Sequence, residues 1–225
     1  MPQIRTPLVI DHYYHIFNRG VARQPTFLTR FDYKYALGAL EYYLYSSPQI
    51  PYSQFLSLGS TEQQNAKESL VKKEKIVEII SYVLMPNHFH LLLKQTQNEG
   101  ISTFMSKWGN SYARYFNAKH KRVGPVFQGR FKSVLVETTE QLIHLSRYIH
   151  LNPVVSAVVS ENKFEEYEWS SFREYINKGS SGFCSKNCIL EHFRDVNEYK
   201  NFVEDRISYG KELEKIKHLS FELDE

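Results

Sequence analysis

The chain has 225 residues, 42% hydrophobic and 24% charged, a balance typical of a soluble globular protein with one main core. Its formal charge of +3, from 28 Lys and Arg against 25 Asp and Glu, is too small an excess to indicate a nucleic-acid partner by itself. The first 20 residues lack the apolar core of a signal peptide and no apolar run is long enough to cross a bilayer, so we expect a cytoplasmic protein.

The first half of the chain predicts a strand, a helix and a hairpin. Residues 12–20, HYYHIFNRG, are rich in aromatic and β-branched residues and predict a strand that ends in a turn. Residues 29–47 carry apolar side chains at helical spacing behind Thr29, which is a good N-cap. The polar segment 47–68 predicts an inserted loop or short helix. Two further strands follow, EKIVEIISYVLM and HFHLLLKQT, joined by a tight turn at Pro86 and Asn87.

The second half predicts a helix, a strand and another helix. An amphipathic helix runs from Gly100 to about His120, and a strand covers VFQGRFKSVLVE, residues 126–137. Thr138 or Thr139 caps a further helix, EQLIHLSRYIHLN, which Pro153 is expected to stop because its ring disfavours helical geometry at the preceding residue.

This order of elements predicts an α+β fold of the ferredoxin-like, RRM-like type. In such a split βαβ arrangement, helices cover one face of an antiparallel sheet, and we expect the other face to stay free for a ligand. We expect one domain over residues 1–160, with the probable insertion at 47–68, and a C-terminal helical extension over 161–225 that packs on it.

Basic residues cluster in the second half of the chain, where aromatic residues are interleaved with them. Such a mixture suits a surface that follows a phosphate backbone while bases stack on rings, although a solvated helix face beside ordinary core aromatics explains it equally well. The basic residues are Lys107, Arg114, Lys119, Lys121, Arg122, Arg130 and Lys132.

Two histidines stand one residue apart in the apolar run SYVLMPNHFHLLLK. Alternate side chains of a strand point the same way, so His88 and His90 share a face and could offer two imidazoles to a divalent metal, although hydrogen-bonded histidines are the commoner explanation. Tyr148 and Asn152 are four residues apart and therefore neighbours on one flank of the last helix. Taken singly, a packing tyrosine and an asparagine that ends a helix are their ordinary roles.

Four motifs in order resemble the single-tyrosine transposases of the IS200 type, in the HUH nuclease superfamily: FNRG, MPNHFHLLL, GPVFQGRFKS and YIHLNPV. The later YEWSSF is similar to their REP-associated branch, and the resemblance covers about residues 13–175. It implies that His88 and His90 are metal ligands, that Asn152 is the third ligand where other branches carry Gln, and that Tyr148 is the nucleophile. It also implies single-stranded DNA as the substrate, often presented as a hairpin.

The resemblance predicts an enzyme that cuts and rejoins DNA through a covalent 5′-phosphotyrosine. Mg²⁺ or Mn²⁺ would act as a Lewis acid on the scissile phosphate. A free phenol has a pKa near 10 and needs help to ionise, for which His144 and His150 are candidates, although solvent-exposed histidines are the simpler interpretation of both.

DNA contacts are expected from four cations: Arg19 after the first strand, Arg114 on the amphipathic helix, and Arg130 and Lys132, which alternate along a predicted strand and so share a face. A monomer and a homodimer are both compatible with the sequence. Two other functions stay open. One is a nucleic-acid-binding module without catalysis, and the other is a metallohydrolase, which would need a carboxylate near the ion.

Overall fold

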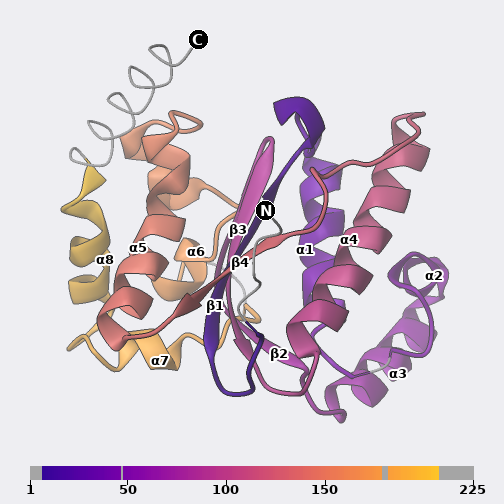
Figure 1. Ribbon diagram of the computed structural model, residues 1–225, viewed down its shortest axis with the longest axis horizontal. Helices are drawn as coiled ribbons and strands as arrows, with labels where there is room; N and C mark the ends of the chain where they lie inside the picture. The colour runs from indigo at the N-terminus through magenta and orange to yellow at the C-terminus, as the bar shows by residue number, and fades with distance from the viewer. Residues whose placement is uncertain (1–6, 47, 179–181, 208–225) are drawn as a thin grey trace.

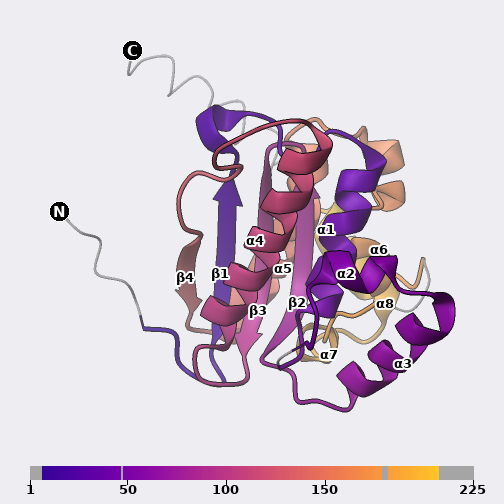
Figure 2. The ribbon, with the colours of Figure 1, turned by 90° about the vertical axis from the view of Figure 1, so that its right-hand side faces the viewer.

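A four-stranded antiparallel sheet forms the centre of the computed structural model, which describes residues 7–46, 48–178 and 182–207 (Figure 1). The strands lie in the order β2-β3-β1-β4, as Figure 2 shows, so the predicted split βαβ fold of the α+β class is confirmed. The predicted turn at Pro86 and Asn87 joins the second strand to the third. The strands are β1 (Tyr13–Arg19), β2 (Val77–Met85), β3 (His88–Gln95) and β4 (Lys132–Val136).

Helices cover both faces of this sheet, whereas the sequence predicted one covered face. On one side lie α1 (Arg30–Tyr42) and α4 (Gly100–Lys119), with α2 (Tyr52–Ser57) and α3 (Ser60–Val71) beside them (Figure 1). On the other side α5 (Thr139–Val155) packs against β2. The reason is that β2 is apolar on both faces: Ile80, Val83 and Met85 are fully buried in a second core beneath α5. The open part of this face is therefore limited to the region beside β1 and β4.

The C-terminal part of the described chain packs on α5 and β2. The Trp169 carbonyl accepts a hydrogen bond from the Leu84 amide at 2.9 Å, which fastens the return of the chain to the edge of the sheet. Residues 208–225 of the predicted extension lie outside the described residues. Within the described ranges, none of the helices has the length and apolar character needed to cross a bilayer. The elements of this part are η2 (Glu161–Glu166), α6 (Phe172–Tyr175), α7 (Asn187–Leu190) and α8 (Val196–Glu204).

Helix α5 continues through Pro153, whereas the sequence predicted that it would stop before this residue. The Ser156 amide donates to the Asn152 carbonyl at 2.9 Å, a regular helical bond whose donor lies four residues beyond the expected end at Asn152. Pro153 lacks the N–H that would bond to the Ile149 carbonyl, but the helix continues to Val155, and Ala157, with a left-handed φ of 53°, follows its C-cap Ser156. Asn152 is therefore held by helical geometry, one turn after Tyr148.

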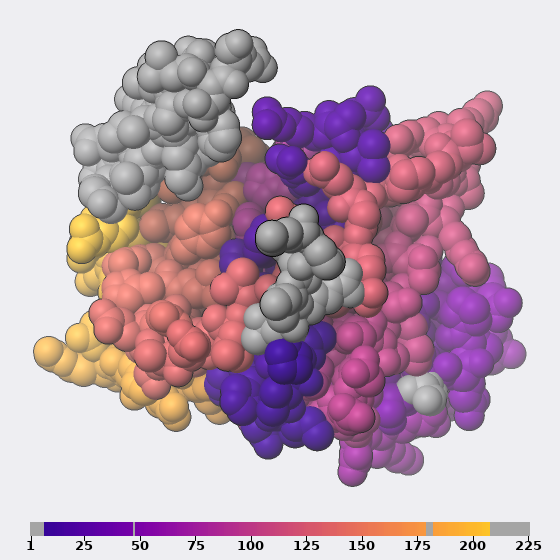
Figure 3. Space-filling model, in the orientation of Figure 1, coloured from indigo at the N-terminus to yellow at the C-terminus, as the bar shows by residue number. Residues whose placement is uncertain are grey.

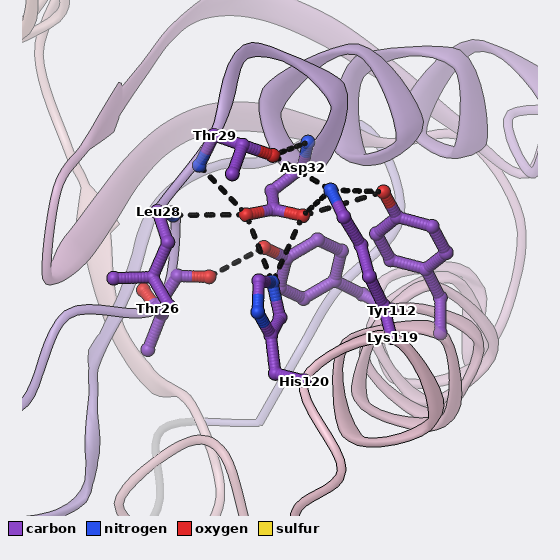
Figure 4. Close-up of polar contacts among 8 residues, drawn as sticks. Thr26, Leu28, Thr29, Asp32, Tyr112, Lys119 and His120 are labelled. Atoms are coloured by element: carbon purple, nitrogen blue, oxygen red, sulfur yellow. Dashed lines mark hydrogen bonds and ion pairs between the residues drawn. The ribbon is translucent and has the colours of Figure 1, made fainter.

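Asp32, which is fully buried, joins the beginning of α1 to the end of α4 (Figure 4). Its carboxylate accepts hydrogen bonds from the Thr29 and Leu28 amides at 2.8 and 3.0 Å, which completes a capping box with Thr29. It also accepts from Lys119 Nζ at 2.7 Å and lies 3.2 Å from His120 Nε2. Burial alone would raise the pKa of Asp32, but the hydrogen bonds from Lys119, the backbone amides and His120 outweigh it and lower the pKa to about 2.

We expect Asp32→Asn to lower the free energy of unfolding by about 2 kcal/mol at pH 7, because it leaves the Lys119 ammonium without its buried counter-charge. The pKa of Asp32 is lower in the folded chain, about 2, than the unfolded value of about 3.9. Its contribution is thus present above about pH 4 and is lost as the pH falls towards 2. Urea denaturation across this range should show the difference between wild type and variant shrinking.

Asp11→Asn is the matched control, because the Asp11 carboxylate pairs with Lys94 at the surface, where it is 74% exposed. We expect it to change the free energy of unfolding by less than about 0.5 kcal/mol. A difference between wild type and Asp32→Asn that stays constant from pH 5 to pH 2 would contradict this account of Asp32.

Candidate active site

His88, His90, Tyr148 and Asn152 come together where α5 crosses β3. His88 Nε2 lies 3.2 Å from Asn152 Oδ1, and the rings of His90 and Tyr148 are 5.5 Å apart and edge to face. The two histidines and Asn152 are largely enclosed, whereas Tyr148 is 44% exposed. The structure thus gathers the four residues in one site and leaves the phenol accessible.

Local sequence explains this placement. Phe89, between the two histidines, points to the opposite face of β3 and packs edge to face on Trp108 at 4.8 Å. On α5, Leu142 and Ile149 are buried against the sheet, which turns the flank that carries Tyr148 and Asn152 towards the histidines. The alternation of a strand and the four-residue spacing of a helix are both needed to build the site.

The Asn87 side chain fixes the tautomer of His88. Its Nδ2 donates to the Arg23 carbonyl at 3.3 Å, so its Oδ1 is the atom that faces His88 Nδ1, at 2.6 Å. An amide oxygen only accepts, so Nδ1 carries a proton, and in a neutral His88 ring Nε2 then carries a lone pair. This lone pair faces Asn152 Oδ1, another acceptor, which also receives a hydrogen bond from Ser156 at 3.5 Å. Two acceptors that face each other in this way suit a bound cation.

His90 has a histidine partner of its own, His15 on β1, which the sequence interpretation missed. His15 Nε2 lies 2.9 Å from His90 Nδ1. Burial lowers the pKa of His90 well below its usual value, with smaller effects from His15 and His88, and burial lowers the pKa of His15 to about 4. Both rings are neutral near pH 7 and can offer lone pairs. The sequence did contain a signal for this contact. The first and third strands are neighbours in a split βαβ sheet, and His15, like Arg19, points to the face that carries His88 and His90.

Two of the four predicted DNA-binding cations flank the site. Arg19 is the register partner of His88, and its Nε donates to Gln128 Oε1 at 2.6 Å. Lys132 begins β4 opposite Phe17, whose ring lies 5.8 Å from that of His90. Both cations are exposed. In the orientation of Figure 1, the surface is hollowed between α5 and the central strands, as Figure 3 shows.

The other two cations lie on the far side of the sheet. Arg130 does not share a strand face with Lys132, because β4 begins only at Lys132 and the left-handed Gly129, at φ 64°, turns the chain before it. Arg130 instead lines a cavity of about 430 Å³ against α4, together with Trp108. Arg114 lines a separate cavity of about 680 Å³ between α4 and residues 48–53. Neither residue lies beside His88, His90, Tyr148 and Asn152.

The two candidate bases on α5 face the C-terminal helices. His144 Nδ1 lies 2.6 Å from Arg147 Nη2, and its ring is 5.6 Å from that of Phe202 on α8. His150 is fully buried, contrary to the expectation of an exposed side chain, because α8 and the segment around Ser171 cover it. Its Nδ1 lies 2.7 Å from the Tyr199 hydroxyl and its Nε2 lies 2.8 Å from Ser171 Oγ. Burial lowers the pKa of His150 to about 3.

The donor set suits a divalent ion that also binds phosphate oxygens. Two imidazole nitrogens and one amide oxygen are neutral ligands, and three ligands leave coordination positions for a substrate. Among the described residues no group of three or more His, Cys, Asp and Glu side chains is arranged to hold a metal. Asn152 places an amide oxygen 3.2 Å from His88 Nε2. The set also lacks the thiolates of structural zinc.

Comparison with known proteins agrees with this geometry. Residues 59–152 match the family described as "Transposase IS200 like", and the matched segment contains all four residues of the site. This segment, less than half of the chain, is therefore similar to the IS200-like transposases. The REP-associated tyrosine transposase of Escherichia coli (strain K12) is 26% identical to it over 124 residues, which cover 54% of this chain and 72% of that protein.

A solved structure supports the fold. It is the structure of a REP-associated tyrosine transposase bound to a REP hairpin, and it matches with a TM-score of 0.52 at 17% identity. The match covers 83% of this chain and 96% of that chain, so it extends well beyond residues 59–152. The central sheet and the helices on its two faces therefore share one architecture with that protein.

The buried His150 generates a prediction about stability. Its pKa is lower in the folded chain, about 3, than the unfolded value of about 6.5, so the unfolded chain binds a proton first as the pH falls. The contribution of His150 to the free energy of unfolding is therefore fully present above about pH 6.5 and becomes progressively smaller below it. We expect the stability difference between wild type and His150→Gln to narrow by about 2 kcal/mol from pH 7 to pH 5.

Urea denaturation at pH 5, 6 and 7 measures this difference. His144→Gln is the matched control, since His144 is on the same helix but 46% exposed in its side chain, and its difference from wild type should stay nearly constant. Parallel pH profiles for wild type and His150→Gln would show that His150 is not held neutral.

Proposed function

We propose that this protein is a metal-dependent endonuclease and strand transferase that cuts and rejoins single-stranded DNA. The observation that carries the proposal is the position of an accessible tyrosine hydroxyl beside three neutral metal ligands. Tyr148 is 44% exposed and packs edge to face on His90, while His88 and Asn152 face each other at 3.2 Å. The IS200-like family match supports it, because this is a family of transposases.

In the proposed reaction, the Tyr148 oxygen attacks the scissile phosphorus. The phenol loses its proton, the phosphorus–oxygen bond to the 3′-oxygen breaks, and that oxygen leaves as a 3′-hydroxyl. The DNA stays attached through a 5′-phosphotyrosine, whose bond resembles the one that was cut, so a 3′-hydroxyl can later attack it and rejoin the strand. His88, His90 and Asn152 would hold Mg²⁺ or Mn²⁺, which supplies Lewis-acid stabilisation of the charged phosphate.

Arg19 and Lys132 would position the strand by contacts to its phosphates. They flank the histidines on β1 and β4, and both are exposed. Because a structurally similar REP-associated tyrosine transposase is bound to a REP hairpin, we propose hairpin-containing DNA as the substrate here as well. Arg114 and Arg130, across the sheet, can contact only DNA that extends beyond the catalytic face.

The test is the formation of a covalent adduct. Wild-type protein incubated with labelled single-stranded hairpin DNA and Mg²⁺ or Mn²⁺ should give a protein–DNA band that resists denaturation and disappears with chelator. Tyr148→Phe keeps the ring but removes the nucleophile, so adduct formation should fall by at least about 10³-fold. Tyr45→Phe, a partly buried tyrosine near the end of α1, is the control and should behave as wild type.

The outcomes separate the alternative functions. Nicking without an adduct, unchanged in Tyr148→Phe, would assign the protein to the metallohydrolases. Binding of varied hairpins by wild type without any cleavage would favour a recognition module that lacks catalysis.

The phosphate contacts predict the salt dependence of binding. Each lost contact should reduce the slope of the logarithm of the binding constant against the logarithm of salt concentration by about 0.7 for a single strand. We therefore expect Arg19→Ala and Lys132→Ala each to flatten the slope by this amount in fluorescence anisotropy titrations. Lys72→Ala, an exposed lysine after α3, should leave the slope unchanged. If all three variants give the same slope as wild type, Arg19 and Lys132 do not contact the phosphates of the DNA.

A further inference from the structure

A histidine of β1 stands directly behind one of the proposed metal ligands. The register of β1 on β3 pairs Phe17 with His90 and His15 with Leu92, so His15 lies diagonally next to His90 on the same face. His15 Nε2 is 2.9 Å from His90 Nδ1, and the two rings are stacked with their centroids 5.1 Å apart. A side chain outside the segment matched by the family thus contacts the site.

We propose that His15 is a positioning residue that holds His90 in the tautomer whose Nε2 is free to bind the metal. The inference rests on the proposed function, because it concerns a ligand of the proposed metal. His15 itself binds no metal in this scheme and acts only through its hydrogen bond to His90.

The tautomer of His90 depends on which ring carries the proton shared by His90 Nδ1 and His15 Nε2. If His90 Nδ1 donates to His15 Nε2, then Nε2 of a neutral His90 keeps its lone pair and is left for a ligand. If His15 donates instead, the proton of His90 sits on Nε2 and blocks coordination. Only the first arrangement is compatible with a metal at His90.

The other histidine is arranged in the same way. Asn87 Oδ1 lies 2.6 Å from His88 Nδ1 and can only accept, so Nδ1 carries a proton, and in a neutral ring Nε2 is the lone-pair atom. Each proposed ligand therefore has a hydrogen-bond partner on Nδ1, one from the hairpin turn and one from β1. Partners of this kind fix the ring orientation and tautomer of metal-binding histidines.

Packing keeps the His15 ring in place. Phe17 lies beside it with a centroid separation of 4.8 Å, and the ring of Tyr148 meets it edge-on at 6.2 Å. A rotation of His15 away from His90 would therefore disturb contacts with a neighbouring aromatic ring and with the proposed nucleophile.

Metal binding in the absence of DNA tests the role of His15 without any measurement of activity. We expect His15→Phe, which keeps a ring but removes the acceptor, to weaken Mn²⁺ binding by about 10- to 100-fold in isothermal titration calorimetry. His15→Gln retains an acceptor oxygen and should recover most of the affinity. His12→Phe is the matched control, because His12 is exposed on the same segment, and it should bind Mn²⁺ as wild type does.

Nitrogen NMR of the metal-free protein provides a second readout. In wild type we expect His90 to be protonated on Nδ1 and not on Nε2, and in His15→Phe we expect this preference to be lost. A wild-type His90 protonated on Nε2 would overturn the proposal, and this measurement decides the question even where His15→Phe fails to fold.

The two proposals fail in different ways. If wild type binds Mn²⁺ and a folded His15→Phe variant binds it with the same affinity, only the role of His15 is overturned. Wild-type protein that binds no Mn²⁺ or Mg²⁺, with or without hairpin DNA, would overturn the metal site of the proposed function and the role of His15 with it.

Discussion

The packing of α5 on β2 and β3 is the constraint on which the rest of the structure depends. The proposed nucleophile and one proposed ligand come from the helix, while the two histidines come from the strand, so their separation is set by how the helix lies on the sheet. That contact is apolar: Leu142 and Ile149 meet Val83 and Leu92, all buried. Burying each such side chain contributes about 1.5–3 kcal/mol, more than any single polar contact within the site.

The opposite side of α5 is fastened by hydrogen bonds. His150, fully buried, bridges the Tyr199 hydroxyl of α8 and Ser171, and Ser171 in turn accepts from the Tyr82 amide of β2 at 2.9 Å. Tyr199 also meets Ser146, one turn before His150, at 2.8 Å. The C-terminal helices therefore help to fix the position of α5 on the sheet and its rotation about its own axis. This gives the C-terminal part of the chain a role in the geometry of the site, in addition to covering the core.

Much of the fold and part of the site followed from periodicity and local chemistry. The N-cap at Thr29, the hairpin at Pro86 and Asn87 and the common face of His88 and His90 depend on residues close in sequence, so one sequence was enough to predict them. The roles of Tyr148 and Asn152 came from the family resemblance. The structure brings both beside the histidines, and their roles remain proposals.

What the sequence did not reveal depends on contacts between distant segments. His15 becomes a neighbour of His90 only when β1 pairs with β3, and His150 is buried only because α8 and the segment near Ser171 cover it. Arg130 was misplaced because the turn at Gly129 delays the start of β4. Pro153 was expected to end α5, but the helix continues to Val155.

In the proposed reaction, one tyrosine beside the histidine pair becomes covalently bound to DNA. Mass spectrometry of the protein after reaction with hairpin DNA and nuclease digestion tests this claim most directly, because it locates the attached nucleotide on a single residue. The account predicts a phosphonucleotide on the peptide that contains Tyr148, formed only when a divalent metal is present. A nucleotide attached to any other residue, or cleaved DNA with unmodified protein, would contradict it.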